Sequence, residues 1–316
     1  MPLFEISKIA FIAVAVILLA AVPGFLLVKR RIIEESSISS FSKLLLYVAS
    51  PCLVVFSFRS SPFSPEKLAD LGIFALVTLV LHCVMMGGAY LVLHKKYKKT
   101  LYRIITVATT FGNCAFFGIP LMEALLPDIA PDLIIYTSVY SFVMNVIGWT
   151  VASAIISGDI RYVSVRKVLL NPTTISTAVA LLLFVTEMPI YPDLENMIEM
   201  MGKTCTPLSM LIMGMRLATI KLPTLFTNYR VYLTIAAKQL LMPLVGFLLV
   251  FFLPVDPGLR AALFIIAACP VASVVLNYSE LVGEGQREAA NMVLLGTMLS
   301  IVTLPIVMLL LPLLGI

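Results

Sequence analysis

Long apolar runs separated by short polar breaks dominate the chain from end to end. A run of about 20 apolar residues crosses the hydrocarbon core of a bilayer as a helix, because each residue adds about 1.5 Å. The pattern therefore predicts an all-α integral membrane protein. The ten predicted membrane helices cover 6–28, 38–58, 70–93, 102–125, 133–156, 168–186, 197–219, 230–253, 260–281 and 289–314.

Composition and cysteine placement agree with this interpretation. Hydrophobic residues make up 60% of the chain and charged residues 12%, whereas a soluble domain carries about 25% charged residues. The net charge of +5 comes from bases in short loops and not from a basic, aromatic-rich patch of the kind that binds nucleic acid. All five cysteines lie inside apolar runs without a CxxC pair. We therefore expect no metal, no cofactor and no nucleic-acid partner.

Lysine and arginine are unevenly divided between the two sides of the predicted helices. Fifteen lie in or beside the loops that follow odd-numbered helices, and four lie on the opposite side. Because basic loops stay in the cytoplasm, the odd-numbered loops are predicted to be cytoplasmic. The sequence thus predicts a multi-pass protein of the inner or plasma membrane with both termini outside the cytoplasm.

The chain can be laid on itself with a shift of about 157 residues. The shift places Glu123 on Glu280 and the Gly112-Asn113 pair on Cys269-Pro270. Each unit contains five predicted helices, an odd number, so the two copies must cross the membrane in opposite directions. Inverted repeats of this kind are typical of secondary transporters, whose site lies where the copies meet. The predicted repeats are 1–157 and 158–316.

Two predicted helices are interrupted in the middle of the membrane. The helix at 102–125 contains Gly112-Asn113 and then Pro120, and the helix at 260–281 contains Cys269-Pro270. In a helix interior glycine costs about 1 kcal/mol and proline about 3 kcal/mol relative to alanine. Unpaired backbone groups in lipid cost more, so such breaks persist only in buried or water-filled surroundings. Breaks at corresponding positions of two repeats indicate the binding site.

A helix that restarts in mid-membrane directs its first N–H groups and positive dipole end into the cavity, which favours a carboxylate. The amide of Asn113 can donate to a carboxylate or accept from a hydroxyl; the alternative is a structural role, in which it binds loose carbonyls at the break. The candidate substrate-binding residues at the breaks are Asn113, Gly112, Cys114, Pro270, Val271 and Ala272.

Several further polar residues lie inside predicted helices, where charge is costly and usually functional. Lys238 and Gln239 could contact an anionic substrate or replace a coupling ion, and Lys238 could instead extend to the interface. His82 is a candidate proton relay or a hydrogen-bonded core residue. Glu123 and Glu280 are candidates for gating, proton coupling or ion pairs at helix ends. The remaining candidates for lining the cavity are Asn145, Asn277 and Asn291.

Motifs along the whole chain resemble one family. They are Pro23-Gly24-Phe25, Pro51-Cys52, the stretch from Phe111-Gly112-Asn113 to Gly118-Ile119-Pro120-Leu121, Asn171-Pro172, and Cys269-Pro270 followed by Thr297 to Pro305. On these residues the chain is similar to the auxin efflux carrier family, within the wider group that includes bile-acid/sodium symporters. The Gly-Asn…Gly-x-Pro break is the most specific of these motifs.

The resemblance implies two inverted five-helix repeats with crossed, broken helices four and nine. It implies a scaffold of helices 1, 2, 6 and 7, and a transport unit of helices 3–5 and 8–10 that moves like an elevator. It also implies transport of small organic anions, such as auxin-type aromatic acids or malonate-like dicarboxylates, by a homodimer. Asn113 matches the position that contacts the substrate carboxylate in the plant carriers.

The chain also departs from the family pattern, and rival classes remain. The long hydrophilic loop of many plant members is replaced by the short stretch from Ser157 to Lys167, and the acidic-Gly-x-x-Gln-Asn sodium pattern is missing. Sodium coupling is therefore not predicted, and proton coupling stays open. A membrane enzyme is disfavoured because no HExxH or paired-aspartate motif is present. A channel or a non-transporting ligand sensor of the same fold remains the alternative.

Overall fold

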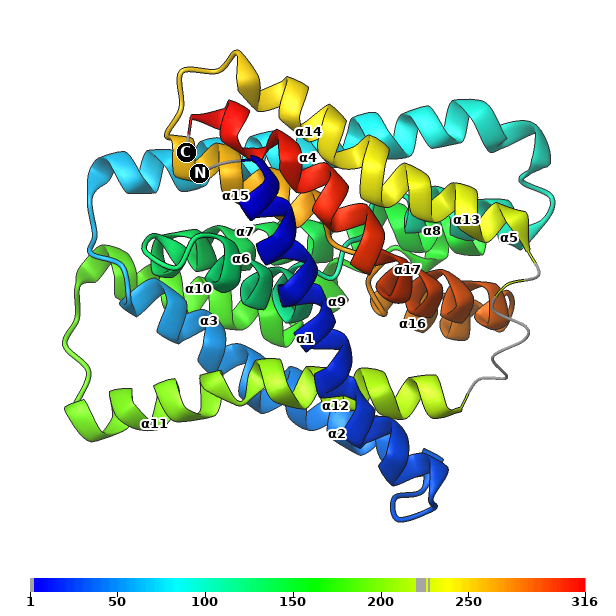
Figure 1. Cartoon of the computed structure of the whole chain (residues 1–316), viewed down its shortest axis with the longest axis horizontal. Coiled ribbons are helices and arrows are strands. Elements are labelled where there is room, and N and C mark those ends of the chain that lie inside the picture. The colour runs from blue at the N-terminus through cyan, green and yellow to red at the C-terminus, as the bar shows by residue number, and fades with distance from the viewer. Residues whose placement is uncertain (1–2, 220–225, 227, 316) are drawn as a thin grey trace.

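The computed structural model describes residues 3–219, 226 and 228–315 (Figure 1). Lys221, one of the bases used to predict orientation, lies outside these residues. The described residues are helical over most of their length, and the β-pairing among them is one isolated bridge between Gly112 and Val271. Figure 1 shows α4 and α14 along one edge and α11 and α12 along the opposite edge, with α6, α7 and α15 between them.

Seven helices among the described residues are long and apolar enough to cross a membrane. They confirm an all-helical integral membrane protein, whereas ten crossings and inverted repeats remain predictions. The elements within these seven helices are α1 (Leu3–Lys29), α2 (Ile38–Leu44) with η2 (Leu45–Ala49) and α3 (Ser50–Arg59), α4 (Pro65–Leu93), α7 (Ala130–Ile147) with η5 (Gly148–Ala152) and α8 (Ser153–Ser157), α9 (Val165–Leu169) with α10 (Pro172–Thr186), α13 (Tyr229–Ala236) with η8 (Ala237–Leu241) and α14 (Met242–Phe251), and α17 (Gln286–Val307) with η9 (Met308–Leu314).

The three other predicted helices are each divided in two. The fourth and ninth are divided at the predicted breaks, and the seventh is divided at Thr204, beside the polar residues that interrupt its apolar run. Their parts are α5 (Thr100–Ala108) and η4 (Cys114–Gly118) with α6 (Ile119–Leu125), α11 (Pro192–Lys203) and α12 (Cys205–Ala218), and α15 (Pro257–Ala268) and α16 (Val274–Val282). Each part is too short to cross the hydrocarbon core alone.

Local sequence signals set several helix starts. Ser64, Asn171 and Asp256 each accept a hydrogen bond from a backbone N–H in the first turn of the following helix. In all three a proline follows directly, and its fixed φ and missing donor suit the first helical position. These caps place the ends of α4, α10 and α15 on the residues that the sequence indicates.

The closest helix packing is between α1 and α12, where two glycines lie at the contact. A Cβ on Gly24 would lie 2.0 Å from the carbonyl oxygen of Leu211, and one on Gly214 would lie 1.8 Å from that of Ala21. Only glycine fits at either position, since small residues let helix backbones approach closely in membranes. Elsewhere α3 packs on α10 and α11, and α1 also contacts α17 and α6. The division into scaffold and transport unit remains a prediction.

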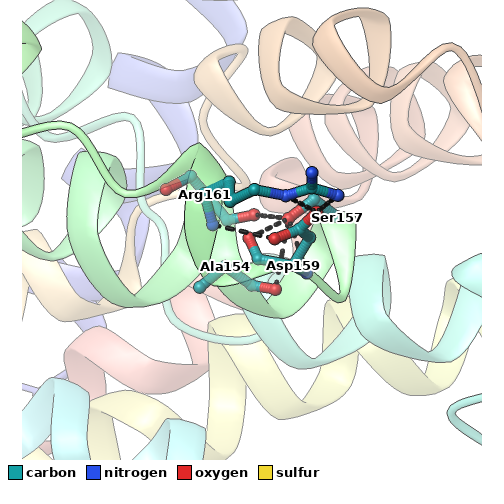
Figure 2. Close-up of polar contacts among 5 residues, drawn as sticks. Ala154, Ser157, Asp159 and Arg161 are labelled. Carbon is teal, nitrogen blue, oxygen red and sulfur yellow. Dashed lines mark hydrogen bonds and ion pairs between the residues drawn. The ribbon is translucent and has the colours of Figure 1, made fainter.

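A compact turn joins the two predicted repeats (Figure 2). After α8 the chain turns through Gly158, whose φ is +71°, and the Asp159 carboxylate accepts from the backbone N–H and Nε of Arg161 at 2.9 and 2.8 Å. Ser157 Oγ donates to the Asp159 carbonyl at 3.0 Å. The guanidinium of Arg161 lowers the pKa of Asp159. The connection is therefore short and locally hydrogen-bonded.

Candidate functional site

The two interrupted helices cross at their breaks. The backbone N–H of Asn113 donates to the carbonyl of Pro270 at 2.7 Å, and the N–H of Ala272 donates to the carbonyl of Phe111 at 2.9 Å. Between these hydrogen bonds lies the isolated antiparallel bridge. Each break thus pairs backbone groups that the other leaves free, which lowers the cost of irregular backbone inside the membrane. The structure brings together the break residues that the sequence predicts.

Lys238 of η8 lies beside the second break. Its side chain is fully buried, and Nζ donates to the carbonyls of Ala267 and Cys269 at 2.6 and 2.9 Å. These carbonyls end α15, where the helix dipole favours a cation. A Cβ on Gly112 would lie 2.9 Å from Nζ, so the first break approaches the same lysine. Lys238 therefore lies in the protein interior and does not extend to the surface.

Gln239 has a different set of partners, on α17. Its Nε2 donates to the carbonyl of Gly296 at 2.6 Å, and its Oε1 accepts from the hydroxyl of Thr303. Both Lys238 and Gln239 are fully buried and lie outside the linings of the cavities around Asn113. Contact of either side chain with substrate therefore remains a prediction, and their present contacts are with helices α15 and α17.

A cavity of about 230 Å³ lies beside the crossing. Of the predicted residues, Gly112, Asn113, Cys114 and Ala272 line it, whereas Pro270 and Val271 take part in the pairing behind it. Its wall is rich in hydroxyl and amide groups. Besides Asn113, the hydroxyl and amide residues of the lining are Ser50, Thr137, Ser138, Ser141, Asn145, Asn171, Thr173, Ser273 and Asn277. Asn145, a predicted cavity liner, lies in this wall, and its Nδ2 donates to Thr174 Oγ1 at 2.8 Å.

A second cavity of about 160 Å³ and a vestibule of about 910 Å³ connect this region with the surface. The smaller cavity shares Asn113 and Ser273 with the 230 Å³ cavity, and it shares Arg216 with the vestibule. Asn277 lines all three spaces, and Asn291 lines the vestibule, as predicted. The charged residues of the vestibule are Glu35, Lys43, Arg216, Glu280 and Arg287. The vestibule therefore opens on the base-rich side of the predicted topology.

The helices that restart after the breaks direct donors toward the 230 Å³ cavity. The backbone N–H groups of Phe116, Ser273 and Val274 have no acceptor within the described part of the chain, and all three residues line that cavity. The side-chain amide of Asn113 likewise makes no hydrogen bond to any described residue, although Asn113 is partly exposed. Free donors at two helix starts form a site that can bind an anion without a cation in contact with it.

The predicted titratable residues lie apart from this cavity. His82 is buried in α4; its Nδ1 lies 2.8 Å from the carbonyl of Thr78, and its ring packs against Tyr140 at 5.1 Å between centroids. Glu123 is exposed on α6, and Glu280 is exposed in the vestibule. The structure does not bring these three residues together with Asn113, and their roles in proton coupling or gating remain predictions.

Sequence reasoning missed Ser138 and Ser141 of the polar wall. Together with the predicted Asn145 they follow one another at intervals of three and four residues in α7, so the three share one helix face. That spacing was a usable signal. Arg216 was counted only as a loop base because it ends an apolar run, and no local pattern marks it as lining both the vestibule and the cavity next to Asn113.

Comparison with known protein families gives one match. A family model described as membrane transport protein matches residues 9–161 and again 159–308, which together cover nearly the whole chain and both breaks. No curated protein matches the chain. The match agrees with the resemblance found in the sequence at the level of the transport family, and membership of a wider group with bile-acid symporters remains a prediction.

Proposed function

We propose that this chain, which belongs to the membrane transport protein family, is a secondary carrier of a small organic anion. The family match and the seven apolar helices among the described residues support a multi-pass membrane transporter. The observation that carries the proposal is the crossing of two broken helices beside a cavity that both helix starts line. In secondary transporters such half-helix starts face anionic substrate groups near the midplane.

The proposed binding mode uses neutral donors. One carboxylate oxygen accepts from the N–H groups of Ser273 and Val274 at the start of α16, and the other accepts from the Asn113 amide and the first turn of η4. Hydroxyls and amides of α7 then contact the remainder of the ligand. The cavity of about 230 Å³ limits the ligand to a small molecule or to one end of a longer one.

We propose an elevator-like alternating-access cycle in which the present structure is the state open to the cytoplasm. The vestibule and the smaller cavity reach Asn113 from the base-rich side. Helices 3–5 and 8–10 carry both breaks, so their movement against helices 1, 2, 6 and 7 would carry the site as one piece. The proposed assembly is a homodimer, and the proposed location is the inner or plasma membrane with both termini outside the cytoplasm.

We further propose that sodium does not drive transport. The carbonyls of Ala267 and Cys269, at the break, are ligands of the kind that a coupling cation uses in carriers with broken helices. In this chain the Lys238 ammonium already binds both. Uptake should therefore be the same in sodium and choline buffers of equal ionic strength. A tenfold or greater dependence on a sodium gradient would contradict this part of the proposal.

The main test is uptake by proteoliposomes of labelled malonate, succinate, a short monocarboxylate and indole-3-acetate. Wild type is compared with Asn113→Ala and with Asn196→Ala, a matched change on the exposed face of α11 away from the cavities. We expect saturable uptake of at least one acid by wild type and Asn196→Ala, and strongly reduced uptake by Asn113→Ala at substrate concentrations that half-saturate wild type. Counterflow separates the carrier from a channel, and binding without flux would indicate a sensor. If none of the acids is moved, the organic-anion assignment fails.

A further inference from the structure

A groove on the membrane face of the protein lies apart from the proposed transport site. It has a volume of about 480 Å³ and lies between α4 on one side and α13, η8 and α14 on the other, with α5 as its floor. None of its described lining residues lines the vestibule or the cavities around Asn113. A ligand in this groove would therefore not occupy the substrate site.

Most of the groove wall is apolar and faces the position of the bilayer. Val84, Leu233 and Leu241 are large apolar residues of its lining, and they are 48%, 63% and 51% exposed. Gly88 lies in the wall of α4, and a Cβ built there has open space around it within 4 Å. The groove is thus open along its side, with a shape that suits a flexible hydrocarbon chain lying along α4.

One end of the groove carries two cations and two tyrosines. Lys96 Nζ lies 5.4 Å from the ring centroid of Tyr102, and Arg230 Cζ lies 5.9 Å from the same ring and 4.8 Å from that of Tyr229. Lys96 and Arg230 are the only charged residues in the described lining, and no described residue forms an ion pair with either. Two cations that share one ring and have no acidic partner among the described residues can bind a phosphate group.

The arrangement places charge and hydrocarbon where a lipid has them. The cations lie at the base-rich end of α4 and at the start of α13, the side predicted to be cytoplasmic, while the apolar wall extends toward the bilayer centre. Tyrosines are typical of the headgroup level, and basic pockets between membrane helices bind anionic headgroups. We propose that this groove binds one anionic phospholipid, with its phosphate on Lys96 and Arg230 and one acyl chain along Gly88.

The test uses purified full-length protein in detergent, with added phosphatidylglycerol or phosphatidylcholine, and native mass spectrometry to count bound lipid. We expect phosphatidylglycerol to bind and to raise the thermal unfolding temperature. In the double variant Lys96→Gln/Arg230→Gln its affinity should fall about tenfold or more. The matched control is Lys95→Gln/Lys98→Gln, which removes two neighbouring cations that do not line the groove.

A second pair of variants tests the groove without changing charge. Gly88→Leu should fill it and weaken lipid binding severalfold, whereas Gly72→Leu, at an equally open position near the other end of α4, should not. If both double variants bind phosphatidylglycerol equally, or if phosphatidylcholine binds as tightly in wild type, the proposal is overturned. It is also overturned if Gly88→Leu changes the monomer–dimer ratio without changing lipid binding, because a second copy of the chain then covers the groove.

Discussion

The two breaks look alike in sequence but differ in what they present. At the first, Asn113 is partly exposed and lines two cavities. At the second, Cys269, Pro270 and Val271 are all buried, and none of them lines a cavity around Asn113. The difference indicates that the first break presents the Asn113 side chain to the cavity, whereas the second presents mainly the backbone at the start of α16. Correspondence of position between two segments thus does not imply correspondence of role.

The carbonyl groups at the helix ends before the two breaks also accept hydrogen bonds from different kinds of donor. At the end of α5 the hydroxyls of Thr109 and Thr110 donate to the carbonyls of Thr106 and Val107, both at 2.8 Å. At the end of α15 the same need is met by the buried ammonium of Lys238. Neutral threonine hydroxyls of the same segment bind the carbonyls at the end of α5, whereas the charged side chain of Lys238, from another helix, binds those at the end of α15. The stability of the second break should therefore depend more strongly on a single residue.

The largest effect on stability is expected from Lys238→Met. Loss of the ammonium group leaves the two buried carbonyls of Ala267 and Cys269 without a donor, which costs about 1–3 kcal/mol each. We expect the thermal unfolding temperature in detergent to fall by several degrees, and expression to fall with it. Thr110→Val at the first break should cost less, and Lys8→Met, on the exposed part of α1, should cost almost nothing. Equal unfolding temperatures for Lys238→Met and Thr110→Val would contradict the expectation that the second break depends on a charge and the first does not.

The next largest effect is expected on substrate affinity, and it compares Asn113 at the first break with Ser273 at the second. Asn113→Ala removes a side-chain donor, so the half-saturating substrate concentration should rise about 10–100-fold, as for a hydrogen bond to a charged group. Ser273→Ala keeps the backbone N–H that faces the cavity, and the rise should be only a few-fold. Initial uptake rates across a substrate series, at matched protein incorporation, give both numbers. A larger defect in Ser273→Ala would contradict the proposal that the first break acts through its side chain and the second through its backbone.

A smaller effect is expected where the two breaks touch. Gly112→Ala adds a Cβ that would lie 2.9 Å from Lys238 Nζ, so the lysine must shift away from its carbonyls. Overpacking of this kind costs about 1–3 kcal/mol. Because the cost arises through Lys238, Gly112→Ala should matter less in the Lys238→Met background. The unfolding temperatures of the two single variants and the double variant test this coupling. If the two decreases in unfolding temperature simply add, Gly112 and Lys238 are not coupled and the explanation is wrong.

The smallest effect on the unfolding temperature is expected in the turn between the predicted repeats. This turn lies outside both breaks and therefore serves as a reference for them. The pKa of Asp159 is lowered by Arg161, so this contact adds stability above the pKa of the unfolded state and loses it as pH falls through the lower, folded-state value. Because Asp159 and Arg161 are solvent-exposed partners, Asp159→Asn should change the unfolding temperature by about a degree or less at neutral pH. At a pH below the folded-state pKa of Asp159 the variant and wild type should unfold together.

The sequence predicted the helices and both breaks because glycine, proline and charge act locally. The structure has its breaks at Gly112-Asn113 and at Pro270. Proline alone is not sufficient for a break, because Pro23 and Pro305 lie inside the continuous helices α1 and α17. The partner of Lys238 could not be predicted, since its two carbonyls lie 29 and 31 residues away and no periodicity encodes that contact. The division of the seventh helix was signalled only weakly, by polar residues that interrupt its apolar run. The vestibule depends on packing between segments from both halves, which a single sequence does not report.

The glycine contact between α1 and α12 also has a consequence for biogenesis. Gly24 and Gly214 are separated by about 190 residues of chain. At a synthesis rate of about 5–20 residues per second, α1 leaves the ribosome roughly 10–40 seconds before its partner. During that interval the small-residue face of α1 must remain in lipid or against the insertion machinery. Assembly of this helix pair is therefore post-insertional, and a ribosome stalled before α12 would hold a first half in which the glycine face of α1 still lacks its partner.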